Sequence, residues 1–275
     1  MKHVVITGGT RGIGIALARR FLELGCRVTI AGRSEGSTRA AIDQLLREVP
    51  EHGALLSAHA CDVSKLEELE ALWRYAKERA PVDMWINNAG TSAPLAPLWE
   101  LPAPVLQDVV DTNVRGVLLG SWVAMRGMRE QNAGVIYNLE GFGSTGMMFP
   151  GVLAYGASKR AVAYISKALA AEAHGSAVRV CTIDPGAVRT DMVAATWSNV
   201  AGSSRFMAAV IGALAIDAQE VARLLVPRLL ENQRSGVRIL PWNVAIAWLR
   251  LLAVPLSLLR SAFNANKVDP PRQRP

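Results

Sequence analysis

The stretch HVVITGGTRGIG, residues 3–14, decides the fold, because it places an apolar run directly before a glycine-rich turn. His3–Thr7 has the composition of a buried β-strand. Apolar residues after the glycines recur at helical spacing: Ala16, Leu17, Phe21 and Leu22. A strand, a glycine loop and a helix in this order can bind a phosphate, because the glycines let the backbone approach it and the helix N-terminus attracts its charge. For the glycines alone, an ordinary turn is the alternative.

Similar local patterns predict further strands and helices along the chain. The predicted strands are Arg27–Ala31, Leu55–Ala60, Met84–Ile86, Gly134–Leu139, Ala177–Ile183 and Val237–Leu240. The predicted helices are Ala40–Val49, Leu66–Lys77, the alanine-rich run from Tyr155 to Ala173, and Asp217–Glu231.

Composition excludes several classes of protein. The chain has 275 residues, of which 51% are hydrophobic and 19% charged, so it is neither disordered nor a coiled coil. The net charge is +7, but the basic residues are scattered, which favours an anionic cofactor or membrane surface over nucleic acid. Cys26, Cys61 and Cys181 lie far apart in apolar segments and predict neither disulfides nor a metal site. With a start of Met-Lys-His, we expect no signal peptide and a reducing, cytoplasmic location.

The end of the second predicted strand indicates which dinucleotide is bound. Proteins that prefer NAD carry a carboxylate there for the ribose hydroxyls, and this chain has Gly32-Arg33-Ser34 instead. Arg33, together with Arg11 in the glycine loop, would flank a 2′-phosphate, so NADP(H) is preferred over NAD(H). Two ordinary surface arginines are the alternative. Asp62 is placed for a hydrogen bond with adenine, as the N-cap of the next helix, or for both.

Tyr155 and Lys159 stand four residues apart in YGASK, so on a helix both side chains project from one face. A fixed positive charge beside a tyrosine favours the phenolate and lowers the pKa of the phenol. A phenol prepared in this way can give its proton to a carbonyl oxygen as hydride arrives at the carbon, or take part in the reverse reaction. Taken alone, the same spacing also occurs as a plain pair on a solvated helix.

The motifs TGGTRGIG, CDV, NNAG, DTN and YGASK occur in an order and at spacings that resemble those of the short-chain dehydrogenase/reductase family, over about residues 3–192. The resemblance implies a single-domain, Rossmann-like, doubly wound parallel α/β sheet of about seven strands with helices on both faces. It also implies a homodimer or homotetramer. We expect a catalytic domain over residues 1–241, with a substrate lid at about 193–216, and an apolar extension over 242–275 that ends in a basic tail.

Family roles are carried over to matching positions. The resemblance makes Tyr155 the acid/base and has Lys159 lower its pKa and hold the nicotinamide ribose, while Asn113 continues a proton relay through water. A helix-interior asparagine with a local hydrogen bond is the alternative for Asn113. The expected cofactor-binding residues are Gly8, Thr10, Arg11, Gly12, Ile13, Gly14, Arg33, Asp62, Val63, Asn88, Ala89, Gly90, Tyr155, Lys159, Pro185, Gly186, Val188 and Thr190.

The chain departs from the family at the serine that binds the substrate oxygen. That serine usually lies thirteen residues before the tyrosine, where this chain has Phe142, and residues 138–146 form a segment one residue longer than usual. Ser144 is the expected replacement, with Thr145 or a backbone amide behind it, and a structural turn serine is the alternative. Glu140 would either handle a proton, or pair with a nearby arginine or face water.

The NLEGFGS segment and the later VLAYGASK also resemble the chlorophyll b reductase branch, whose members reduce a ring formyl group. The resemblance therefore implies an NADP(H)-dependent oxidoreductase acting on a carbonyl, or the alcohol, of a bulky hydrophobic substrate. The missing serine leaves a non-catalytic dinucleotide-binding sensor or scaffold as the alternative. In residues 242–275 the apolar runs are shorter than the roughly 20 residues that span a bilayer, so this extension either packs against the protein or a partner subunit, or makes peripheral membrane contact.

Overall fold

The computed structural model describes residues 1–197 and 215–241, and within this part of the chain seven parallel strands form one sheet. The strands are β1 (His3–Thr7), β2 (Arg27–Gly32), β3 (Leu56–Ala60), β4 (Met84–Asn87), β5 (Gly134–Leu139), β6 (Val178–Ile183) and β9 (Arg238–Ile239). Their order is β3-β2-β1-β4-β5-β6-β9. The direction of winding reverses between β1 and β4, and such a reversal opens a crevice at the carboxyl ends of the strands.

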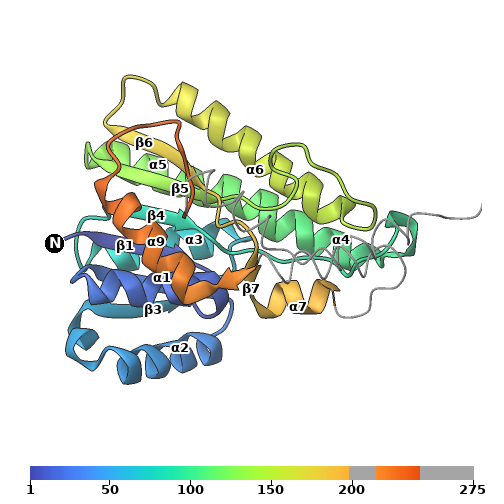
Figure 1. The fold of residues 1–275 in the computed structure, drawn as a ribbon. Coiled ribbons are helices and arrows are strands. Elements are labelled where there is room, and N and C mark those ends of the chain that lie inside the picture. Colours follow the sequence, from blue (N-terminus) through green and yellow to red (C-terminus); the bar gives the residue numbers. More distant parts are fainter. Residues whose placement is uncertain (198–214, 242–275) are drawn as a thin grey trace, which may run out of the picture.

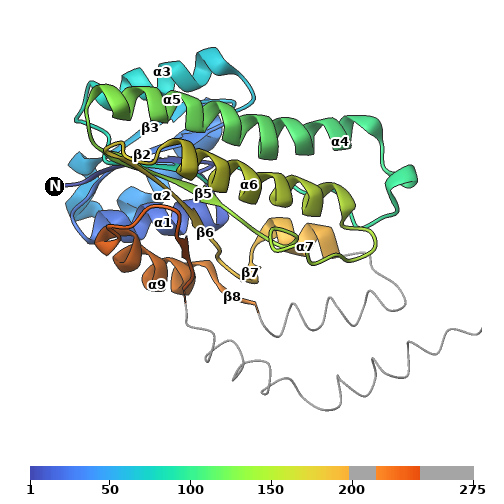
Figure 2. The ribbon, with the colours of Figure 1, turned by 90° about the horizontal axis from the view of Figure 1, so that it is seen from above.

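Helices cover both faces of the sheet (Figures 1 and 2). One face carries α1 (Gly12–Glu23), α2 (Glu35–Glu48) and α9 (Ala218–Glu231). The other carries α3 (Leu66–Lys77), α5 (Gly116–Glu130) and α6 (Leu153–Glu172). The helix α4 (Ala103–Val110) runs into α5 through a π-helical turn, η3 (Asp111–Arg115). The remaining short elements are η1 (Pro50–Leu55), η2 (Leu98–Glu100), α7 (Asp191–Trp197) and a parallel pair of strands, β7 (Val188–Arg189) and β8 (Ile216–Asp217).

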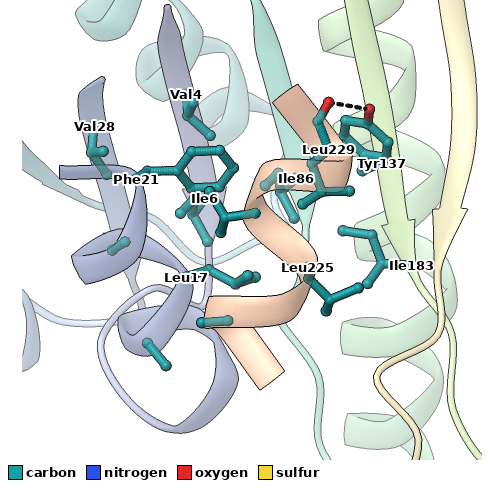
Figure 3. Packing of buried hydrophobic residues seen from close by; sticks show 14 of the residues in the cluster. Val4, Ile6, Leu17, Phe21, Val28, Ile86, Tyr137, Ile183, Leu225 and Leu229 are labelled. Carbon is teal, nitrogen blue, oxygen red and sulfur yellow. Dashed lines mark hydrogen bonds between the residues drawn. The ribbon is translucent and has the colours of Figure 1, made fainter. Parts of the chain in front are cut away.

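The two faces of the sheet are packed because successive strand residues point to opposite sides. Val4 and Ile6 of β1 belong to the core shared with α1 and α9, whereas Val5 belongs to the core shared with α3 and α5. Figure 3 shows the first of these cores, in which Tyr137 of β5 also donates a hydrogen bond of 3.0 Å to the carbonyl of Leu229 in α9. The sheet is therefore buried on both sides, and ligands have access at the strand ends.

The seven-stranded, doubly wound fold expected from the resemblance is confirmed, and the predicted strands are present with small changes at their ends. The prediction for the second helix was wrong at its start: it begins at Glu35, not at Ala40, because the Ser34 hydroxyl caps it by accepting a hydrogen bond from the Ser37 N–H. The last strand, predicted over four residues, has two, Arg238–Ile239.

Most of the predicted lid and the whole extension lie outside the described residues. Within the described ranges, no helix combines the length and the apolar character that crossing a membrane requires. The three cysteines, Cys26, Cys61 and Cys181, are buried free thiols.

Candidate active site

A cavity of about 900 Å³ lies where the carboxyl ends of the strands meet. It brings together predicted site residues that lie far apart in the sequence. The predicted residues that line it are Gly8, Thr10, Arg11, Gly12, Ile13, Gly14, Arg33, Asp62, Val63, Asn88, Ala89, Gly90, Ser144, Tyr155, Lys159, Pro185, Gly186, Val188 and Thr190. Asn113 is fully buried and lies behind this wall.

The glycine loop is held against the end of β4. The Asn88 side-chain amide donates hydrogen bonds of 2.9 Å to the carbonyls of Thr7 and Gly8. Gly8 has a φ of +62°, which favours glycine, and a Cβ on Gly14 would lie 2.2 Å from the Gly8 carbonyl oxygen. Side chains are thus excluded at Gly8 and Gly14, and the first turn of α1 lines the cavity. This is the local chemistry that a pyrophosphate requires.

The end of β2 is cationic. Arg33 lines the cavity beside Ser34 and Ser37, and its Nη2 lies 3.4 Å from Asp108 Oδ1 of α4. Both side chains are largely exposed, so this pair is weak and can be exchanged for another anion. Asp108 was not among the predicted site residues, because nothing local relates it to Arg33.

Asp62 is placed in the cavity wall, but it does not cap the following helix. Its Oδ1 accepts hydrogen bonds from the N–H of Ser64 (3.0 Å) and from the Ser64 hydroxyl (2.8 Å), and the N-cap of α3 is Lys65. The cap alternative was therefore wrong, since the turn after β3 delays the start of the helix. A contact with adenine stays a prediction.

Tyr155 stands in the first turn of α6, with Lys159 one turn later on the same face. The Lys159 ammonium is 5.8 Å from the centre of the Tyr155 ring and donates a hydrogen bond of 3.0 Å to the carbonyl of Leu139 at the end of β5. Lys159 is only 4% exposed, and Tyr155 is half-buried at the cavity wall. The two polar groups thus converge on one region of the cavity.

The pKa values of this pair correct the expectation from the sequence. Burial, followed by the charge of Asp184, raises the pKa of Tyr155 to about 12. Burial also lowers the pKa of Lys159 to about 8, against the opposing effect of the Glu140 carboxylate. The neighbouring cation was predicted to lower the pKa of the phenol, whereas in the structure burial and the charge of Asp184 raise it.

Asn113 lies in η3, the π-helical turn between α4 and α5. Its side-chain oxygen accepts from the N–H of Thr91 (2.8 Å), and its amide donates to the Thr91 carbonyl (2.9 Å) and to the Ser158 hydroxyl (2.9 Å). Ser158 in turn donates to the Tyr155 carbonyl (2.7 Å). Asn113 therefore ties the NNAG segment to the first turn of α6, and its part in a water relay stays a prediction.

Gly141 occupies the position that faces the tyrosine hydroxyl. A Cβ on Gly141 would lie 2.6 Å from the Tyr155 hydroxyl oxygen and 3.5 Å from Lys159 Cε. The residue beside the hydroxyl is thus Gly141, which directly precedes Phe142, and the correspondence of Phe142 to the family serine stays a prediction. Ser144 is buried in the cavity wall, and its role as replacement stays a prediction.

Glu140 precedes Gly141 and pairs with an arginine, one of the outcomes expected for it. Its carboxylate is 2.9 Å from Nε of Arg238 in β9, and Arg238 also pairs with Asp184. The sequence offered no signal for Arg238, since an arginine in a short terminal strand has no local pattern that points to a distant carboxylate.

Replacing Gly141 should impair catalysis while cofactor binding is retained. We expect Gly141→Ala to lower kcat about a hundredfold or more, because the new methyl group displaces the Tyr155 hydroxyl, and misplacement by about 1 Å can have this effect. The matched control is Gly156→Ala, whose Cβ would meet nothing closer than 4.0 Å. Equal kcat in the two variants, measured by NADPH oxidation, would contradict the assignment.

Binding of NADP(H) should take up a proton at alkaline pH. In the free protein the pKa of Lys159 is about 8, and an anionic ligand beside the ammonium raises it. Affinity is therefore constant below about pH 8 and falls up to about tenfold per pH unit above it, because the ammonium must be re-protonated. Calorimetry in buffers of different ionisation enthalpy measures the uptake. A Lys159→Met variant should show none, and undiminished uptake in that variant would refute the prediction.

Comparisons with known proteins agree with this geometry. The model of the short chain dehydrogenase family matches residues 2–201. A chloroplastic chlorophyll(ide) b reductase of Arabidopsis thaliana is 37% identical over 241 residues, covering 85% of this chain and 67% of the relative. Of two longer relatives, this chain spans only 48% and 53% of the length.

Solved structures lead to the same family. A levodione reductase structure is 27% identical with a TM-score of 0.77, covering 87% of this chain and 95% of the other. The structure of actinorhodin polyketide ketoreductase with NADPH is 30% identical with a TM-score of 0.74, with the same coverage. Together with the seven-stranded sheet and the motifs that line its cavity, these matches show that the chain belongs to the short-chain dehydrogenase/reductase family of oxidoreductases.

Proposed function

We propose that this chain uses NADP(H) to reduce the carbonyl group of a bulky hydrophobic substrate, or to oxidise the corresponding alcohol. The observation that carries the proposal is the pair of Tyr155 and Lys159, buried in the same cavity as the glycine loop and Arg33. The similarity to chlorophyll(ide) b reductases supports a ring formyl group as the acceptor.

The proton chemistry follows from burial of the pair. Bound NADPH supplies the hydride. Because the pKa of Tyr155 is about 12, its hydroxyl is protonated at neutral pH and can donate a proton to the carbonyl oxygen, whose basicity rises as it becomes an alkoxide. The Lys159 ammonium then stabilises the phenolate that is left.

The lining of the cavity supports a hydrophobic substrate. Gly141 presents no side chain next to the Tyr155 hydroxyl, so the hydroxyl is not covered by a side chain from this loop position. Apolar side chains of Phe142, Met147 and Val152 line the same cavity and suit a hydrophobic body. Ser144 would bind the substrate oxygen from the loop between them.

A homodimer or homotetramer, and a cytoplasmic location with peripheral membrane contact through residues 242–275, belong to this proposal on the strength of the sequence alone.

The preference for NADP(H) can be tested at Arg33. A charge-assisted hydrogen bond to the 2′-phosphate contributes about 1.5–3 kcal/mol, so Arg33→Ala should weaken NADPH roughly ten- to hundredfold and leave NADH nearly unchanged. Arg39→Ala, an exposed arginine on the next turn of α2 that does not line the cavity, is the control. Nucleotide fluorescence gives both dissociation constants. Equal losses for the two nucleotides would count against a 2′-phosphate site at Arg33.

The activity itself can be tested with NADPH and a panel of aromatic, steroid and tetrapyrrole aldehydes. We expect turnover to be greatest with the largest apolar aldehydes, and Tyr155→Phe to lower kcat by about two to four orders of magnitude with NADPH binding retained. If neither wild type nor variant turns over any aldehyde while both bind NADPH, the chain is a dinucleotide-binding scaffold and the proposal fails.

A further inference from the structure

Two carboxylates at the floor of the cavity share one arginine. Glu140 directly follows β5 and Asp184 directly follows β6, and both line the cavity. Arg238 of β9 places Nε 2.9 Å from Glu140 and pairs through Nη2 with Asp184. The side chains of Glu140 and Asp184 are 7% and 16% exposed, whereas that of Arg238 is 37% exposed. The acids are thus buried, and the arginine closes over them from the side of solvent.

The pairing requires the arginine to reach across a strand. In the sheet, β6 lies between β5 and β9, and Thr182 of β6 is the partner of Arg238 in the ladder. Neighbouring strands are about 4.8 Å apart, so β5 and β9 are separated by about 10 Å. Only a long side chain spans this distance, and a guanidinium can serve two carboxylates at once because its N–H groups are fixed in one plane.

Each carboxylate directly precedes a different loop that lines the site. Glu140 immediately precedes Gly141, which faces the Tyr155 hydroxyl, and its backbone N–H donates to the Ile183 carbonyl of β6 (2.8 Å). Asp184 immediately precedes Pro185, and its side chain accepts a hydrogen bond from the Gly186 N–H (3.0 Å). Arg238 therefore joins the loop on the substrate side to the loop expected at the nicotinamide.

The same two carboxylates act electrostatically on the catalytic pair. Tyr155 is faced by Lys159 on its own helix and by Asp184 from β6, and the charge of Asp184 raises the pKa of Tyr155. Lys159 is faced by Glu140 from β5, whose charge raises the pKa of Lys159. An unpaired carboxylate this deeply buried is costly, and its field on its neighbours is strong because little water screens it.

We propose that Arg238 is a positioning residue for the reaction, which holds the two loops at a fixed separation and neutralises Glu140 and Asp184 beside the proton donor. The proposal rests on the proposed function. It assigns Glu140 to the support of the site rather than to proton transfer, because the Glu140 carboxylate pairs with the Arg238 guanidinium.

The test replaces the guanidinium and follows the reaction in both directions. In Arg238→Met the two negative charges are no longer neutralised, so we expect kcat for aldehyde reduction to fall about tenfold or more while KM for the aldehyde changes less than threefold. The rate of alcohol oxidation rises with pH, and this pH limb should move to higher pH by about one unit. At a fixed pH on the rising limb, the rate should therefore fall about tenfold. Asp184→Asn added to Arg238→Met should return the limb toward wild type, because Asp184 is the carboxylate whose charge raises the pKa of Tyr155.

A second readout needs no turnover. The pH midpoint of proton uptake on NADPH binding reports the pKa of Lys159. This midpoint should move to higher pH in Arg238→Met and to lower pH in Glu140→Gln. A loss of folding stability cannot move it in opposite directions. Arg238→Lys, which keeps the positive charge, should leave the midpoint near that of wild type and keeps the test informative if Arg238→Met does not fold.

The control is Arg223→Met, which removes a guanidinium paired with Glu220 on the exposed side of α9 and should leave kcat, the pH limb and proton uptake unchanged. The inference is overturned if Arg238→Met matches this control, or if Asp184→Asn does not reverse the effect of Arg238→Met on the pH limb. If the wild type binds NADPH but reduces no aldehyde, the proposed function fails, and the uptake midpoints still decide the electrostatic role of Arg238.

Discussion

The chemistry of this site depends on one buried charge, the ammonium of Lys159. Lys159 belongs to α6, and its ammonium contacts the end of β5. Its side chain is 4% exposed, so desolvation lowers its pKa to about 8, and what stabilises the charge is the Leu139 carbonyl and the nearby Glu140. Tyr155 shares the same dry surroundings, and its phenol holds its proton more firmly than a tyrosine in water. Ammonium, phenol and carboxylates therefore form one electrostatic unit, in which a change at any member is felt by the others.

Missing side chains shape the site as much as present ones. A Cβ at Gly141 would collide with the Tyr155 hydroxyl, and one at Gly90 would lie 3.4 Å from the Asn113 side-chain oxygen. Together with Gly14 against the Gly8 carbonyl, these positions keep the backbone close to where ligands would bind. At Gly141 the missing side chain leaves the space that the Tyr155 hydroxyl occupies.

Local patterns predicted most of the fold. The buried strands read as short apolar runs, because both faces of the sheet are covered, and β1 has the predicted bounds, His3–Thr7. The predicted start of a helix was wrong where a single hydrogen bond decides it. At Ser34 the hydroxyl caps α2, which begins five residues earlier than the apolar spacing suggested. The predicted cofactor motifs converge on one cavity, because parallel strands end at a common edge.

The sequence by itself determined which elements form, in what order, and which loops carry glycine, because these depend on local backbone chemistry and on the period of apolar residues. Only the tertiary structure decided that Gly141 faces Tyr155, that Arg33 meets Asp108, and that Arg238 bridges Glu140 and Asp184. It also decided the direction of the pKa shift at Tyr155, where burial and the charge of Asp184 raise the pKa. Desolvation and packing are set by segments far apart in the chain, so no local pattern could report them.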